Sequence, residues 1–280
     1  MTESDVPESS ESTLESTRSF PGSRLAWAIH LVILGAYPLV MAALSFSSGE
    51  GDGGAALSPS LGQLFAVVVS ELVLFSLWFG AAWWFSRVSL QGLLFRWNHA
   101  LFTPVYGFLY SIGLRVGVGI AVLATLLVIA GIGGESIDEI ADGFRPDVGK
   151  VVDTDQLGSD PVYLAVNCTI VSFVLAGFRE ELWRVGMIVA LFALFPRLDQ
   201  SVKGRLAAIA FVAVLFGLGH AVQGAGAVVM TALLGLGLGG IIVYHRSIWE
   251  AVIAHGFFDA SSFFMIFVIK RYFAELVPGL

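Results

Sequence analysis

Long apolar runs, separated by short polar stretches, dominate the pattern of hydrophobic and polar positions along this chain. A helix needs about 20 apolar residues to cross a bilayer, whereas barrel strands alternate and need only about 10. The pattern therefore predicts transmembrane helices rather than strands. We expect spans over residues 25–46, 61–85, 108–132, 161–196, 206–220, 222–244 and 248–269.

The composition leads to the same class of protein. Of the 280 residues, 56% are hydrophobic and 13% are charged. A soluble domain of this length could not bury so many apolar side chains, whereas a bilayer accepts them on the outside of a bundle. We therefore predict an all-α, polytopic transmembrane bundle of about 7–8 helices, the number depending on whether residues 161–196 form one long helix or two pieces.

Polar segments precede and separate the predicted spans. Residues 1–20 are rich in Ser, Thr and Glu and cannot bury enough apolar surface to order, so we predict a disordered tail before a single transmembrane domain over 21–280. Residues 88–106 mix aromatic, basic and apolar side chains, which indicates a segment along the membrane interface. Residues 133–160 are the longest polar segment, and their acidic character predicts an exposed loop.

Most Lys and Arg residues near the spans fall on one side of the membrane if residues 161–196 cross it once. By the positive-inside rule this side is cytoplasmic, and the N-terminus lies on it. We expect an integral, multi-pass protein of the plasma membrane of a prokaryote. The residues on this side are Arg18, Arg24, Arg87, Arg96, Arg197, Lys203, Arg205 and Arg246.

Three features narrow the possible functions. Cys168 is the single cysteine, so it forms no intrachain disulfide, and its apolar neighbours indicate packing. The net charge of −7 and the lack of a basic patch argue against a nucleic-acid partner and leave the lipid bilayer as the expected one. The glycines of residues 235–240 follow no predicted strand, which favours close helix packing over a nucleotide-binding loop.

Four charged residues, Arg179, Glu180, Glu181 and Arg184, interrupt an otherwise apolar run. Each charge near the bilayer centre costs roughly 2.5–3.5 kcal/mol, so the cluster costs about ten unless its members pair or face a wet cavity. On a helix Arg184 is within reach of either carboxylate, which would leave the other as a candidate base. The alternative is a short polar loop whose carboxylates are solvated among headgroups.

Buried polar residues also occur in other spans. Glu71 and Arg115 lie within two different apolar runs, and we predict that they form an intramembrane ion pair. His220 ends one span. His255 and Asp259 are four residues apart in the last span, so they share a helix face and the carboxylate can orient or charge-stabilise the ring.

These motifs resemble those of the CPBP family, the CAAX protease and bacteriocin-processing (Abi) intramembrane proteases, which include the Rce1-type prenyl-protein proteases. The family has a Glu-Glu pair followed by Arg, then Phe-x-x-x-His, then His-x-x-x-Asn/Asp. The resemblance covers about residues 161–265 and keeps the family's order of motifs. The matching residues are Glu180 and Glu181 with Arg184, Phe216 with His220, and His255 with Asp259.

The resemblance implies a helical bundle that encloses a polar catalytic cavity and hydrolyses peptide bonds in or near the bilayer. It implies an endopeptidase whose catalytic residues are Glu180, Glu181, His220, His255 and Asp259, supported by Arg184 and Phe216. A physical account fits them: Glu180 polarises a water held with His220, and His255 with Asp259 stabilises the developing oxyanion.

One spacing departs from the family. Three residues usually separate the Glu pair from Arg, and here only Leu182 and Trp183 do. The usual spacing places Arg one helical turn from the second Glu, whereas here Arg184 is a full turn from Glu180. Which of Glu180 and Glu181 is the base therefore stays open.

Other functions stay open as well. We expect no cofactor, but Glu180, His220 and His255 are a possible zinc set. A non-catalytic immunity or scaffold relative is the main alternative to a protease, and a transporter with a buried proton pathway is a weaker one because the chain shows no internal symmetry. The substrate would be a peptide or protein, either prenylated or a bacterial peptide, and no residue chooses between them.

Overall fold

The computed structural model describes residues 22–48, 60–133 and 136–273 of the chain. Every regular element in this described part is helical, which confirms the all-α prediction. The predicted tail, residues 1–20, lies outside the described residues.

Six helical segments are long and apolar enough to cross a membrane. An additional helix, α8 (Val202–Leu218), has 17 residues and packs against α9 along its length. Gly217 faces Val228 and Gly239 faces Ile209, so the two helices are antiparallel. The described residues thus contain six candidate crossings, one fewer than the seven predicted, because α8 is shorter than the others. The six segments are α1 (Arg24–Ser48), α2 (Leu61–Ser86), α3 (Phe102–Gly133), the run Pro161–Leu194, α9 (Ala225–His245) and α10 (Trp249–Tyr272).

The run that contains the charged cluster is one continuous helix whose turns change from α to π and back to α. It begins as α6 (Pro161–Val166), widens into the π-helix η2 (Asn167–Glu180) and ends as α7 (Glu181–Leu194). Ser172 Oγ donates to the carbonyl oxygen of Asn167, five residues earlier, at 2.7 Å. Because π-helical turns are frequent at functional sites, the change from η2 to α7 between the two glutamates marks this position.

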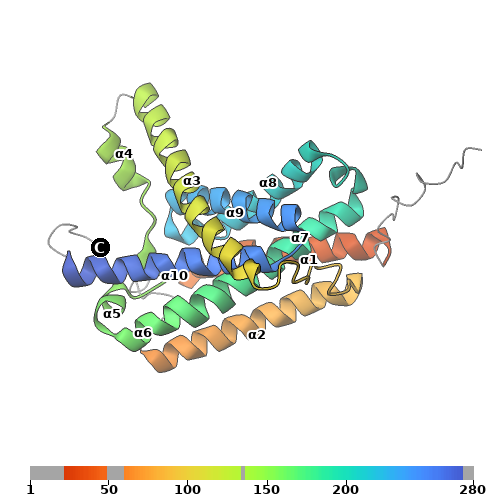
Figure 1. Cartoon of the computed structure of the whole chain (residues 1–280), viewed down its shortest axis with the longest axis horizontal. Helices are drawn as coiled ribbons and strands as arrows, with labels where there is room; N and C mark the ends of the chain where they lie inside the picture. Colours follow the sequence, from red (N-terminus) through yellow and green to blue (C-terminus); the bar gives the residue numbers. More distant parts are fainter. Residues whose placement is uncertain (1–21, 49–59, 134–135, 274–280) are drawn as a thin grey trace, which may run out of the picture.

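Helix α10 extends from the centre of the molecule to its left-hand edge in Figure 1 and packs against η2, α3 and α9. Two glycines let it approach η2 closely. A Cβ on Gly177 would lie 2.8 Å from the carbonyl oxygen of Val252, and a Cβ on Gly256 would overlap the ring of Phe173. This close approach brings the third motif against the first.

The acidic segment 133–160 is not the simple loop that we predicted. It contains α4 (Ile137–Gly143), the 3₁₀ turn η1 (Val148–Lys150) and α5 (Thr154–Ser159). Its acids act partly as caps, because Asp153 accepts from the first backbone N–H groups of α5. Lys270 at the end of α10 lies 2.8 Å from Asp155, which ties α5 to that helix.

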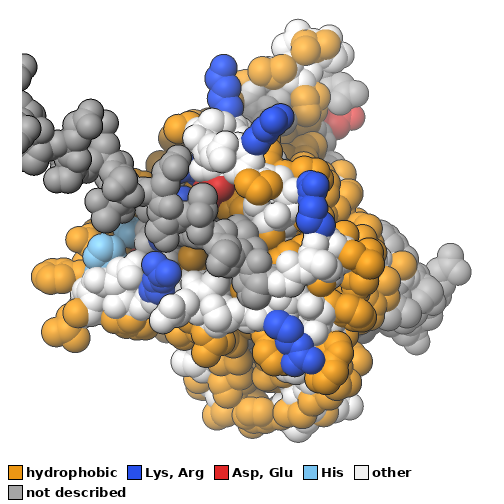
Figure 2. All heavy atoms as spheres, turned by 90° about the vertical axis from the view of Figure 1, so that its right-hand side faces the viewer, with side chains coloured by type: hydrophobic (Ala, Val, Ile, Leu, Met, Phe, Trp, Pro, Cys, Tyr) orange, Lys and Arg blue, Asp and Glu red, His pale blue; other side chains and the backbone are white. Residues whose placement is uncertain are grey.

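The segment between α2 and α3, for which we predicted a place along the membrane interface, is partly buried. Leu93 and Leu94 are only 3% and 4% exposed, and the amide of Ile248 donates to the carbonyl oxygen of Leu94 at 3.0 Å. Part of this segment therefore belongs to the core. Figure 2 shows the end of the molecule on which it lies, where Lys and Arg side chains gather.

The predicted ion pair between Glu71 and Arg115 is wrong. Glu71 instead pairs with Arg179 at 2.6 Å, and Arg115 donates to the carbonyl oxygen of Phe258 at 2.6 Å and to Ser261 Oγ at 2.7 Å. The physical reason is helix placement: α2 packs mainly against α1, whereas α3 packs mainly against α10. Glu71 therefore pairs with η2 and Arg115 bonds to α10, instead of the two pairing with each other.

Candidate active site

Glu181, the first residue of α7, is the fixed centre of the site. Its side chain is fully buried, and its Oε1 accepts hydrogen bonds from the guanidinium of Arg184 and from Nδ1 of His255, the latter at 2.8 Å. Arg184 is only 1% exposed. A buried carboxylate held by a buried cation and a ring nitrogen has little freedom to move.

Glu180 is more open. Its side chain is 18% exposed and its Oε1 accepts from Arg179 at 3.1 Å. Its Oε2 lies 3.8 Å from Nε2 of His255, which is too long for a direct hydrogen bond. The two adjacent glutamates therefore have different surroundings: Glu181 is enclosed, and Glu180 is partly exposed beside a histidine.

His255 stands between three carboxylates. Its Nδ1 is bonded to Glu181, while its Nε2 lies 3.8 Å from Glu180 and 3.8 Å from Asp259. The shared helix face predicted for His255 and Asp259 is therefore present, although 3.8 Å is too long for a direct hydrogen bond between them.

Phe216 and His220, the second motif, lie beside the same group of residues, and the ring of Phe216 makes the contacts. His220 follows the end of α8, and its Nδ1 lies 2.8 Å from the carbonyl oxygen of Phe216, so Nδ1 donates and Nε2 is the acceptor. The ring of Phe216 has its centroid 4.3 Å from the guanidinium carbon of Arg184, 4.7 Å from the ring of His220 and 6.2 Å from that of His255. Phe216 thus supports Arg184 by a cation–π contact and orders both histidines.

One charged residue, Arg179, and one polar residue, Tyr37, lie beside the site although the sequence analysis did not include them in it. Arg179 bridges Glu180 and Glu71, and its side chain is 16% exposed. The hydroxyl of Tyr37 on α1 is buried without a hydrogen-bond partner among the described residues, close enough to Glu180 and Arg179 to interact electrostatically. The sequence could have indicated a role for Arg179, because Arg179 is adjacent to Glu180.

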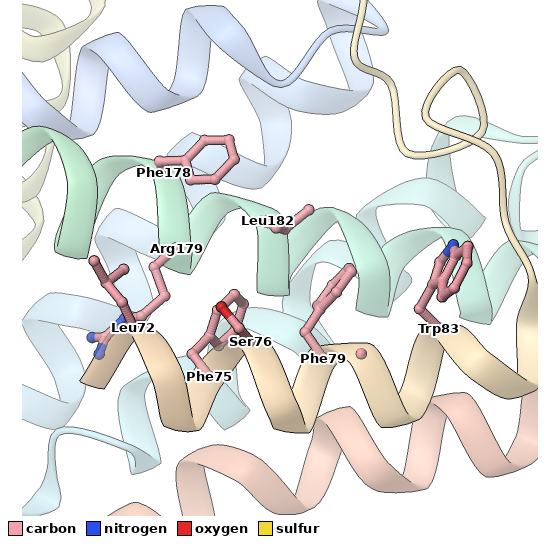
Figure 3. A pocket seen from close by; sticks show the side chains of 9 residues that line it. Leu72, Phe75, Ser76, Phe79, Trp83, Phe178, Arg179 and Leu182 are labelled. Carbon is pink, nitrogen blue, oxygen red and sulfur yellow. The ribbon is translucent and has the colours of Figure 1, made fainter. Parts of the chain in front are cut away.

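A groove of about 280 Å³ lies between α2 and the helix formed by η2 and α7. Figure 3 shows aromatic and aliphatic side chains facing one another across it, with Arg179 toward one end and Trp83 toward the other. Since Arg179 contacts Glu180, the groove leads toward the open glutamate. The residues that line it are Leu72, Phe75, Ser76, Phe79, Gly80, Trp83, Phe178, Arg179 and Leu182.

The predicted zinc set does not form a compact cluster in the described part of the chain. The set of three His, Cys, Asp or Glu side chains whose ligand atoms all lie within 4.8 Å of one another is a different one, made by His99, His245 and Glu250.

Fold and site together define a polytopic membrane protein with a buried glutamate–histidine centre. Residues 163–261 match the model of the Rce1-like family, described as Type II CAAX prenyl endopeptidase Rce1-like. This match confirms the resemblance to the CPBP family that the three motifs predicted, and at family level it supports a CAAX-type intramembrane endopeptidase. No curated protein and no solved structure matches the chain.

Proposed function

We propose that the chain hydrolyses a peptide bond inside the membrane with a water activated by Glu180 and His220. The observation that carries this proposal is the unequal surroundings of the two glutamates. Glu181 is fully buried and engaged by Arg184 and His255, whereas Glu180 is 18% exposed and its Oε2 lies 3.8 Å from His255 Nε2, beyond a direct hydrogen bond. A general base must reach its water, so Glu180 suits this role and Glu181 suits positioning.

The reaction then divides among three groups. Glu180 takes a proton from the water, His220 Nε2 holds that water, and the water oxygen forms a bond to the scissile carbonyl carbon. His255 as an imidazolium donates from Nε2 to the oxyanion, while Nδ1 stays bonded to Glu181. Glu180 returns the proton to the leaving amine nitrogen as the carbon–nitrogen bond breaks.

We propose a prenylated peptide as the substrate. The description of the matching family names such substrates, and the apolar groove that leads to Arg179 offers a place for part of the lipid chain. At about 280 Å³ the groove is near the lower limit of ligand pockets, so the rest of the chain would remain in the bilayer. The peptide would then reach Glu180 from the side of α2.

We also propose that the end shown in Figure 2 faces the cytoplasm. Lys and Arg side chains gather there, as the positive-inside rule expects. The first described helix, α1, begins at this end with Arg24, whose guanidinium donates to the carbonyl oxygen of Leu194 at the end of α7. The N-terminus would then be cytoplasmic.

Direct hydrolysis tests the proposed activity. Purified protein in lipid nanodiscs should cleave a synthetic peptide with a prenylated cysteine near its C-terminus, and mass spectrometry should identify the released fragment. The same peptide without the prenyl group should react more slowly. No cleavage of either peptide by folded protein would favour a non-catalytic relative, and equal rates would remove the prenyl group from the proposal.

Filling the groove should weaken substrate binding. Gly80 lines the groove, and no atom lies within 4 Å of a Cβ placed there, so Gly80→Leu adds a side chain without a clash in the free protein. We expect KM for the prenylated peptide to rise about tenfold with little change in kcat, because one displaced apolar contact is worth 1–3 kcal/mol, roughly 10- to 200-fold.

Gly117→Leu is the matched control, since Gly117 is a mid-helix glycine of α3 with similar open space and no part in the groove. An equal rise in KM for both variants would show that the groove does not bind the lipid chain.

Chelation should leave turnover intact, because the proposed reaction uses a carboxylate and a ring nitrogen to activate water. The measurement is kcat in excess chelator at a temperature where circular dichroism shows an unchanged fold. Loss of turnover, combined with one more equivalent of zinc bound by wild type than by His220→Ala, would favour the zinc mechanism instead.

A further inference from the structure

A second polar cluster lies at the corner where α9 ends and α10 begins. His99 comes from the segment before α3, His245 is the last residue of α9, and Glu250 is in the first turn of α10. Their ligand atoms all lie within 4.8 Å of one another. Glu250 precedes His255 by five residues, about 7.5 Å along the helix axis, so this cluster is distinct from the glutamate–histidine centre.

The two histidines are arranged as metal ligands are. His99 Nε2 lies 3.3 Å from His245 Nδ1. Tetrahedral zinc with bonds of about 2.0–2.1 Å places two ligand nitrogens about 3.3–3.4 Å apart. On its other side the His245 ring lies 2.7 Å from the hydroxyl of Tyr110, which can accept the Nε2 proton. This contact turns the lone pair of Nδ1 toward His99, as outer-shell partners of metal-binding histidines do.

The carboxylate of Glu250 is incompletely hydrogen-bonded by the described residues around it. Its side chain is fully buried, yet Oε2 has no hydrogen-bond partner among the described residues. Its Oε1 accepts a long hydrogen bond of 3.4 Å from Thr103 Oγ1. A buried carboxylate oxygen without a partner is costly, and a cation between it and the histidines would remove that cost.

We propose that His99, His245 and Glu250 bind one divalent first-row transition cation, such as zinc, away from the reacting groups. Two imidazole nitrogens and one carboxylate form a common zinc ligand set, with a water in the fourth position. Both histidines are half-buried, which gives the cation a route from the surface.

The bound cation cross-links three separate parts of the chain. Two hydrogen bonds already hold the segment before α3 to this corner: Asn98 Nδ2 donates to the carbonyl oxygen of His245 at 2.9 Å, and the amide of Ile248 donates to that of Leu94 at 3.0 Å. A metal at His99 strengthens the same attachment and fixes the start of α10. The role is therefore structural.

Metal titration of the purified, untagged protein tests this site. After removal of adventitious metal, one equivalent of Co²⁺ per chain should give the visible absorption of a tetrahedral complex, and zinc should displace it. His99→Ala, His245→Ala and Glu250→Gln should each abolish this signal. Tyr110→Phe should weaken binding about 10- to 100-fold, because it removes only the outer partner of His245.

Thermal unfolding provides the second measurement. Zinc at a hundredfold excess over its Kd should raise the Tm of wild type by roughly 5–10 °C and leave that of His245→Ala unchanged. Glu180→Gln and His220→Ala serve as controls that must keep both the Co²⁺ signal and the Tm shift. Less than a stoichiometric amount of bound metal in folded wild type, or binding that is lost in the controls and kept in His99→Ala, would overturn the proposal.

Discussion

Glu180→Gln should lower kcat for peptide hydrolysis by about 10²–10⁴-fold while KM changes little. General acid–base catalysis contributes a factor of this size, and an amide can neither take the proton of the attacking water nor return it to the amine. The amide is nearly isosteric with the carboxylate and can still accept from Arg179, which lies 3.1 Å from Oε1. The fold should therefore remain.

Glu181→Gln is the informative partner of this variant. Glu181 is held by Arg184 and His255 and touches no open space, so its amide should disturb the position of His255 and leave residual turnover. The exposed Glu139 on α4 provides the control, and Glu139→Gln should behave as wild type. Full activity in Glu180→Gln with none in Glu181→Gln would exchange the roles of the two glutamates.

The bundle could be predicted because burial in lipid depends mainly on the length and composition of a run. The span expected over 61–85 is observed as Leu61–Ser86, and the one expected over 248–269 as Trp249–Tyr272. The start of α3 was placed six residues late, at 108 instead of Phe102. Pro104 lies in the first turn of this helix, where proline is tolerated, so it did not mark a boundary.

The partners of the charged residues could not be predicted, because they depend on which helices pack together. Three arginines in apolar runs could pair with Glu71, namely Arg115, Arg179 and Arg184. The packing of α2 beside η2 selects Arg179. Composition and periodicity describe each helix alone and contain no information on this choice.

The π-helix explains why the motif spacing left the two glutamates undecided. Spacing arguments assume 3.6 residues per turn, and this does not hold within Asn167–Glu180. The regular turn begins at Glu181, so the three-residue separation from Arg184 applies to Glu181 and gives the observed pair. The sequence offers no simple signal for the wide turn that precedes it.

Removing one partner from the buried pair of Glu181 and Arg184 should cause the largest loss of stability among single substitutions in the site. Arg184→Ala removes the cation from a carboxylate that is 0% exposed, and breaking such a pair from one side costs about 3–5 kcal/mol. It also removes the guanidinium that lies 4.3 Å from the ring centroid of Phe216. We expect the free energy of unfolding, measured by denaturant titration in detergent, to fall by this amount.

The exposed pair of Lys150 and Asp147 is the matched control for this measurement. Its side chains are 53% and 54% exposed and 3.9 Å apart, so Lys150→Ala should change the free energy of unfolding by about 0–1 kcal/mol. The double variant Glu181→Leu with Arg184→Met should recover much of the stability lost in Arg184→Ala, because a buried pair can often be replaced by apolar side chains of similar volume. It should remain inactive, since His255 loses the acceptor of its Nδ1 proton. Equal small losses in Arg184→Ala and Lys150→Ala would show that Glu181 does not depend on Arg184, and the separation of the two glutamates into a positioned group and a base would lose its physical foundation.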